Sequence, residues 1–230
     1  MGILSNLLLL TAASAAMADT AAPATPKISS ITFSGSGCAR DPKFSGSFND
    51  PTITFSSFAA SLPGSQTLNC QVHLQATGAS PGWQVSLKTN VIKGRVYLTP
   101  GTSLTHYTTV FFSQDAARSV SSRSQPIPNP NRPPPPPSPR PSFINLLTRP
   151  SSKKSQDTIS GTVSNDGDGT VNEGVTLVAK ADASRVWSPC TGSDGYTGIM
   201  NINFRGALTG DGKAQFVADT EEWDLEWRRC

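Results

Sequence analysis

The sequence predicts an all-β fold, an antiparallel β-sandwich of roughly ten strands with a disordered proline-rich insert. Apolar and polar residues alternate in many short segments, which is the pattern of strands with one buried face. Gly, Pro, Asn and Asp separate these segments, as in Pro81-Gly82, and no long segment keeps the 3.6-residue period of an amphipathic helix. One apolar face per strand is typical of antiparallel sheets that pack face to face.

The alternation is clearest in residues 70–76, 83–88, 92–98, 200–205 and 222–227. In the first of these segments, the apolar residues from Cys70 to Ala76 share one face, while Gln71, His73 and Gln75 share the other. Weaker patterns predict further strands at residues 28–33, 52–58, 107–112, 158–163, 174–180 and 214–218.

The first 18 residues have the features of a secretory signal peptide. Leu7–Leu10 form a short apolar core, and Ala16-Met17-Ala18 is an A-x-A cleavage site that would leave Asp19 as the first mature residue. The apolar run is too short to cross a bilayer, so we expect no membrane span, although an uncleaved signal anchor is the alternative. We predict that the protein is secreted and extracellular, and that residues 19–27 form a flexible lead-in.

Residues 120–156 differ in composition from the rest of the chain. They hold most of the 19 prolines, including Pro133–Pro137, and they carry basic residues but no acidic ones. The formal net charge of +3 comes from this segment, because acidic residues outnumber basic ones elsewhere. Such a segment favours polyproline II and cannot bury a core. We therefore predict a disordered insert within a single β-sandwich domain made of residues 28–119 and 157–230. The remaining chain shows no basic stripe interleaved with aromatic residues, so we expect no nucleic-acid partner.

Two origins of the insert are consistent with the sequence. The first is an intron translated in frame, since Val120-Ser121 can be encoded by GTGAGT, a splice donor, and Gln156 by CAG, which ends in the acceptor AG. Leu147-Thr148 can encode a branch-point sequence between them. The second is a genuine proline-rich surface loop, which the fold would tolerate because the entropy cost of loop closure grows only logarithmically with length.

The four cysteines of the chain are Cys38, Cys70, Cys190 and Cys230. An even number of cysteines behind a signal peptide predicts two disulfides. No two of them form a C-x-x-C unit, so we expect no zinc site and predict neither a metal nor a cofactor. We favour Cys38–Cys70 with Cys190–Cys230, because each pair lies within one half of the chain, and pairing across the halves is the alternative.

Short motifs around these cysteines follow one another in a recognisable order. They are Phe33-Ser34-Gly35-Ser36-Gly37-Cys38, Asn69-Cys70-Gln71-Val72, Gly82-Trp83-Gln84-Val85, Gly94-Arg95-Val96-Tyr97-Leu98, Trp187-Ser188-Pro189-Cys190 and Trp227-Arg228-Arg229-Cys230. Through these motifs, residues 27–118 and 157–230 resemble a family of small secreted fungal four-cysteine proteins catalogued as domain of unknown function 4360. The resemblance implies secretion and the four-cysteine framework but no activity, and the proline-rich insert departs from the family's pattern.

Catalytic chemistry has little support in the sequence. His73 and His106 show no metal or catalytic spacing, and we interpret both as partly exposed strand residues. A copper oxygenase that uses an N-terminal histidine is contradicted by Asp19 at the predicted mature end. Carboxylates that could form the pair of a glycoside hydrolase are Asp50, Glu173, Asp219, Glu221, Glu222, Asp224 and Glu226. The last three alternate along one strand face, which is also how an ordinary charged outer face is built.

The segment from Asn165 to Thr170 begins like a calcium-binding loop. Counted from Asp166, however, the twelfth residue is Leu177, where an EF-hand needs a carboxylate. We therefore interpret the segment as a Gly-rich hairpin turn, with an irregular calcium site as the alternative.

Residues that could bind a ligand without catalysis fall into two groups. Trp83, Trp223 and Trp227 lie on the apolar sides of their strands and are expected in the core. Trp187 precedes Pro189-Cys190 in a loop and is the tryptophan that we would test for sugar stacking. The polar face formed by Gln71, His73 and Gln75 is the second candidate.

These observations predict a class of function and not a specific activity. We expect a non-enzymatic structural or binding protein of the cell wall or extracellular space, with cell-wall polysaccharide or an extracellular protein as its partner. The alternatives are a secreted polysaccharide hydrolase with a carboxylate pair and a secreted effector that binds a host protein.

Overall fold

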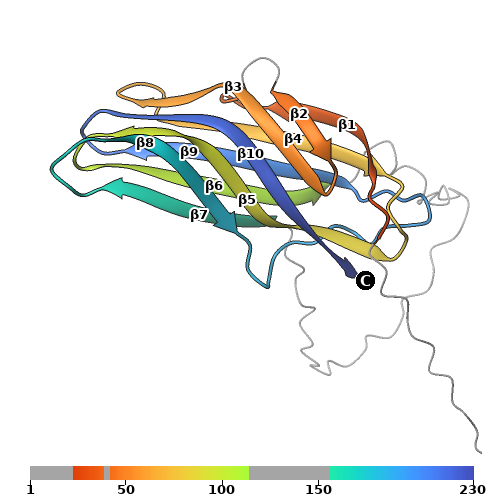
Figure 1. The fold of residues 1–230 in the computed structure, drawn as a ribbon. Helices are drawn as coiled ribbons and strands as arrows, with labels where there is room; N and C mark the ends of the chain where they lie inside the picture. The colour runs from red at the N-terminus through yellow and green to blue at the C-terminus, as the bar shows by residue number, and fades with distance from the viewer. Residues whose placement is uncertain (1–22, 39–41, 114–155) are drawn as a thin grey trace, which may run out of the picture.

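The structure is a computed structural model that describes residues 23–38, 42–113 and 156–230. These residues form ten β-strands and no helix, in two five-stranded antiparallel sheets that face each other (Figure 1). The predicted all-β antiparallel sandwich is therefore confirmed. No helix long and apolar enough to cross a membrane occurs in the part of the chain that the structure describes.

Both sheets combine strands from before and after the segment 114–155. Sheet A contains, in spatial order, β1 (Lys27–Ser34), β4 (Thr67–Thr77), β9 (Ile199–Thr209), β6 (Thr102–Ser113) and β7 (Gln156–Asn165). Sheet B contains β2 (Lys43–Ser47), β3 (Asp50–Leu62), β10 (Ala214–Arg229), β5 (Trp83–Leu98) and β8 (Val171–Lys180). The short strand β2 has no counterpart among the strands that the sequence predicts.

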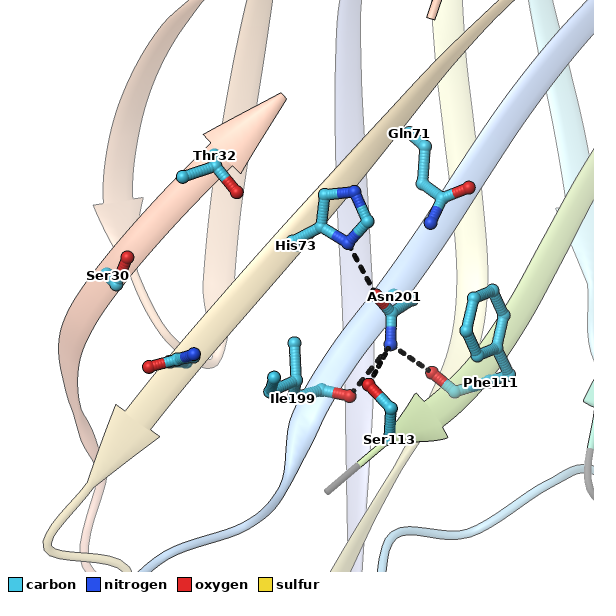
Figure 2. A pocket seen from close by; sticks show the side chains of 9 residues that line it. Ser30, Thr32, Gln71, His73, Phe111, Ser113, Ile199 and Asn201 are labelled. Carbon is cyan, nitrogen blue, oxygen red and sulfur yellow. Dashed lines mark hydrogen bonds between the residues drawn. The ribbon is translucent and has the colours of Figure 1, made fainter. Parts of the chain in front are cut away.

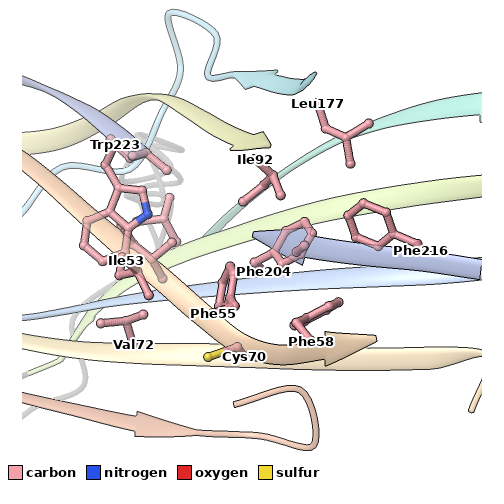
Figure 3. Close-up of a cluster of buried hydrophobic side chains, with 14 of the residues drawn as sticks. Ile53, Phe55, Phe58, Cys70, Val72, Ile92, Leu177, Phe204, Phe216 and Trp223 are labelled. Atoms are coloured by element: carbon pink, nitrogen blue, oxygen red, sulfur yellow. The ribbon is translucent and has the colours of Figure 1, made fainter. Parts of the chain in front are cut away.

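Large apolar side chains from the inner faces of both sheets fill the space between them (Figure 3). Phe58 and Phe216 extend from sheet B and Phe204 from sheet A, and all three side chains are fully buried. Their ring centroids lie 5.1 to 6.3 Å apart, within the range in which aromatic pairs attract each other. This cluster joins the two sheets near the middle of the core.

Bulges explain why two of the strands are longer than the sequence predicts. In β10, Phe216 and Ala218 face the core before a shift of register, whereas Glu221 and Trp223 face it afterwards. A bulge inserts one extra residue and so moves the alternation by one position. At a second shift, between Asp224 and Leu225, the extra residue is Lys88 of β5, so it moves the alternation of β5 instead. The predicted segments 83–88 and 92–98 are thus one strand, as are 214–218 and 222–227.

Gly94 allows β5 to approach β10 closely beside the first bulge. It pairs with Ala218, and a Cβ atom at this position would overlap the backbone carbonyl of Val217. We expect Gly94→Ala to lower the free energy of unfolding by about 1–3 kcal/mol, the usual cost of overpacking. Urea denaturation measures this value. Gly174→Ala on the adjacent edge strand is the matched control, because a Cβ there would have no neighbour closer than 3.9 Å. Equal effects of the two substitutions would contradict this account of Gly94.

Two disulfides fasten the connecting loops to the sandwich. Cys38 is bonded to Cys70, which ties the turn after β1 to β4, and Cys190 is bonded to Cys230, which ties the β8–β9 loop to the end of β10. This is the pairing that the sequence favours. The bonds span 32 and 40 residues, and each contributes about 4 kcal/mol on the chain-entropy estimate.

The ends of the predicted segments differ in detail from those of the structure. Lys27, assigned to the flexible lead-in, is the first residue of β1, and Asn49 donates a hydrogen bond to the Thr25 hydroxyl. Gln156, assigned to the insert, is the first residue of β7 and pairs with Phe111 of β6. Segment 114–155 therefore connects two strands that already lie side by side. The predicted signal peptide, the rest of the insert and the intron hypothesis concern residues outside those that the structure describes.

Candidate ligand-binding face

The outer faces of the two sheets differ sharply in charge. In the strands of sheet A the one acidic residue is Asp157, which is 6% exposed and lies opposite Val110 on the inner side. The strands of sheet B carry the other strand carboxylates, namely Asp50, Glu173, Asp219, Glu221, Glu222, Asp224 and Glu226. The outer face of sheet A consists largely of hydroxyl, amide and imidazole side chains.

Ion pairs cover the acidic row on the outer face of sheet B. Glu222 pairs with Lys93 at 2.6 Å and Asp224 with Lys88 at 3.0 Å. Glu226 pairs with Arg185 at 2.8 Å. These contacts are what an ordinary charged outer face is expected to form, and they leave each of the three carboxylates neutralised by a basic neighbour.

A shallow groove of about 420 Å³ lies on the outer face of sheet A (Figure 2). It brings together Gln71, His73 and Gln75 of β4, the polar face that the sequence singles out. The other lining residues are Ser30 and Thr32 of β1, Ile199 and Asn201 of β9, and Phe111 and Ser113 of β6. No acidic or permanently charged residue is among them.

A chain of hydrogen bonds crosses the floor of the groove from β1 to β6. The Asn201 amide nitrogen donates to the Ile199 carbonyl at 3.0 Å and to the Ser113 hydroxyl at 3.0 Å. Because a carbonyl can only accept, these bonds turn the Asn201 oxygen toward His73, whose Nδ1 lies 2.6 Å away. Nδ1 must then carry a proton, and in the neutral ring Nε2 accepts from the Ser34 hydroxyl at 3.0 Å. His73 and Asn201 are thus fixed in place before any ligand arrives.

Gln71 and Gln75 lie on either side of His73, and their side-chain amides are available to a ligand. Neither amide forms a hydrogen bond with another residue in the described ranges. Each is about 7 Å from His73 along the strand. The half-buried Phe111 ring adds an apolar surface beside them. Neutral amides and hydroxyls around an aromatic ring suit a ligand rich in hydroxyl groups.

The tryptophans do not contribute to the groove. Trp223 is buried in the core and Trp227 packs against it, with its Nε1 donating to the Asn49 side chain at 3.0 Å. Trp83 is half-buried beneath the Arg229 guanidinium, at 4.5 Å. Trp187 lies beside Arg228, whose guanidinium carbon is 4.0 Å from the ring centroid. This contact covers the ring of Trp187 and anchors the loop, which weakens it as a candidate for sugar stacking.

The turn that resembles a calcium loop is held together by its own hydrogen bonds. Asn165 donates to the carbonyls of Leu98 and Gly169 and accepts from the Gly167 backbone. The side chain thus performs the role of a turn-forming residue. Across the described residues, no group of three or more potential metal-binding side chains occurs.

His106 and Glu221 are buried between the sheets, and burial shifts the pKa of each. His106, interpreted from the sequence as partly exposed, is 4% exposed, and burial lowers its pKa. Glu221 is fully buried, and burial raises its pKa to about 7, against the opposing effect of hydrogen bonds from Trp223 and Asn90. Glu221 lies at alternate positions with the apolar residues Trp223 and Leu225, and this alternation is the sequence signal that could have predicted its burial.

Comparisons with known proteins identify a family for part of the chain. Residues 24–132 match the model of the family described as Domain of unknown function (DUF4360), so the motifs indicate the correct domain of unknown function for this part of the chain. The match does not include the motifs around Cys190 and Cys230. No curated protein matches the chain.

Two chains among the solved structures match this chain, and the first match spans most of its length. It is described as "Structure of TmCBM61 in complex with beta-1,4-galactotriose at 1.4 A resolution". The two sequences are 7% identical, and the match covers 89% of this chain and 91% of that chain with a TM-score of 0.23.

Proposed function

We propose that this protein, which matches the DUF4360 family over residues 24–132, is a secreted, non-enzymatic protein that binds polysaccharide of the cell wall or extracellular space. The binding site is the groove on the outer face of sheet A. One observation carries the proposal: two unpaired amides, Gln71 and Gln75, flank an imidazole that is already fixed in position. The amides bind sugar hydroxyls, and Phe111 packs against the apolar face of a sugar ring.

The composition of the groove favours binding over hydrolysis. A glycoside hydrolase places two carboxyl groups about 5–9.5 Å apart around the bond that it cleaves. The groove lining contains no carboxylate, and the acidic row of Glu222, Asp224 and Glu226 lies on the outer face of the other sheet, in ion pairs. Preformed neutral donors and acceptors can hold a glycan without a group that transfers protons to it.

Replacing both free amides should weaken binding strongly. Each hydrogen bond contributes about 0.5–1.5 kcal/mol, so the double variant Gln71→Ala/Gln75→Ala is expected to lose roughly tenfold or more in affinity. Affinity gel electrophoresis against a panel of soluble β-glucan, mannan, xylan, galactan and polyuronates measures this loss. Gln215→Ala, on an exposed position of the opposite sheet, is the matched control and should bind like the wild type.

Two results would refute the proposal. The wild-type protein could migrate without retardation by any polysaccharide of the panel. Alternatively, the double variant could be retarded as strongly as the wild type, which would place the binding site elsewhere. Thermal denaturation of both variants separates a loss of binding from a loss of folding.

A further inference from the structure

Arg205 occupies the middle of the outer face of sheet A. It lies on β9, the central strand of the sheet, and pairs in register with Tyr107 of β6. Its guanidinium carbon is 4.2 Å from the centroid of the Tyr107 ring. Stacking on an aromatic ring restricts the planar guanidinium to few orientations, which lowers the entropy cost of a further contact.

The charge of Arg205 has no partner within the described parts of the chain. The side chain forms no ion pair or hydrogen bond there, and no carboxylate faces outward from any strand of sheet A. Basic residues on the other face, such as Lys88, Lys93 and Arg185, do have acidic partners. Arg205 is therefore an oriented cation whose five N–H donors remain available for an acceptor from outside the protein.

A continuous polar surface connects Arg205 with the groove. Asn201 of the groove lies four residues away on the same strand, a distance of about 13 Å. Asn203 lies between them and accepts a hydrogen bond from Asn69 at 3.2 Å. A ligand that fills the groove and continues along β9 would thus meet Arg205 without crossing a charged or apolar barrier.

We infer that Arg205, stacked on Tyr107, is a carboxylate-binding subsite, and that the ligand is a polysaccharide containing uronic acid residues. This inference rests on the proposed function and specifies its ligand. Sugar hydroxyls of the ligand bind to Gln71 and Gln75 in the groove. A carboxylate further along the polysaccharide forms two parallel hydrogen bonds with the Arg205 guanidinium. The strands of sheet A present no outward-facing carboxylate, so none of them repels an anionic ligand on this face.

The test compares uronic acid polymers with their methyl esters, in which the same sugars carry no charge. Polygalacturonate, alginate and hyaluronate are each titrated as acid and as ester into the full-length secreted protein by isothermal calorimetry. We expect at least one acid form to bind roughly tenfold more tightly than its ester, as charge-assisted hydrogen bonds require. Arg205→Gln should lose this preference, binding both forms as the wild type binds the ester. Arg95→Gln, an exposed arginine on the outer face of sheet B, should keep it.

The possible results distinguish a failure of the carboxylate subsite from a failure of the proposed function. If no acid form binds better than its ester, or if Arg205→Gln keeps the preference, the carboxylate subsite is wrong. Binding of a neutral glucan, mannan, xylan or galactan in that case would still support the proposed function. If neither an acidic nor a neutral polysaccharide binds, both the subsite and the proposed function are wrong. Poly-glutamate serves as a polyanion without sugar rings, and binding of poly-glutamate alone would refute both as well. Melting temperatures of both arginine variants verify that they fold.

Discussion

Replacing Glu221 with glutamine should remove a pH dependence of stability on the order of 3 kcal/mol, since one pKa unit corresponds to about 1.4 kcal/mol. The carboxyl group is fully buried between the sheets, and its pKa is raised from 4.5 to about 7. In the unfolded chain the group ionises above pH 4.5, whereas in the folded protein it keeps its proton until about pH 7. The unfolded state therefore gains stability relative to the folded state as the pH rises through this window.

The direction of the effect follows from this difference. The contribution of Glu221 to stability is fully present below pH 4.5, falls as the pH rises toward 7, and stays at its lowest value above that. Glutamine cannot ionise, and its oxygen can still accept the bonds that Asn90 and Trp223 donate to Glu221 Oε1 at 2.9 Å. In the described structure, Glu221 Oε2 and Asn90 Oδ1 both lack a hydrogen-bond partner. The glutamine amide could supply a donor there.

Urea denaturation of the wild type and Glu221→Gln at pH 4, 6 and 8 tests this expectation. The variant should gain stability relative to the wild type at each step toward high pH. His106 acts in the opposite direction, because its lowered pKa removes stability as the pH falls, but it is present in both proteins and cancels in the difference. A difference that stays constant over the whole range would contradict the raised pKa of Glu221.

Phe204→Ala should be the most damaging single substitution in the core. The ring is fully buried and lies 5.1 Å from Phe58 and 6.3 Å from Phe216, so it connects the two sheets. Removing a buried phenylalanine costs about 3–5 kcal/mol in lost transfer free energy and cavity formation. Chemical denaturation of the oxidised protein measures the loss. Val178→Ala, at the most exposed large apolar residue of the described chain, should change stability by less than about 0.5 kcal/mol. A loss below that value at Phe204 would show that the core is not organised around this cluster.

Alternating polarity was enough to predict the fold class, but not the full length of the strands. Residues 83–88 and 92–98 alternate in opposite phases, and a change of phase looks the same in a sequence whether a strand ends or a bulge interrupts it. The same change of phase in β10 made Phe216 and Trp223, which lie on one strand, look like parts of two separate strands. Only the pairing of both strands with their neighbours distinguishes a bulge from a turn.

The polar side of β4 was predictable from the sequence, whereas the residues of β6 and β9 that complete the groove were not. Gln71, His73 and Gln75 follow directly from the alternation around Val72 and Leu74. Asn201 and Phe111 reach the groove because β9 lies between β4 and β6, and nothing in the local sequence specifies that order. The Tyr107–Arg205 contact depends on the same order.

For Trp187, the local sequence suggested a role in sugar binding that its surroundings in the fold do not favour. A tryptophan in a loop is a reasonable candidate for stacking on a sugar. In the folded protein, the terminal segment brings Arg228 over its ring, while the Cys190–Cys230 disulfide closes the loop nearby. Its neighbours come from a distant part of the chain, so the covering of the ring had no local signal.

The most direct test of the binding site is a chemical-shift titration of the isotopically labelled protein with the polysaccharide fragment that binds most tightly. We predict that the largest changes occur in the side-chain amides of Gln71 and Gln75, the His73 ring and the backbone of Asn201. The outer face of sheet B, followed through Lys93 and Glu222, should stay unchanged. Shifts confined to sheet B or to the loop around Trp187 would contradict the account.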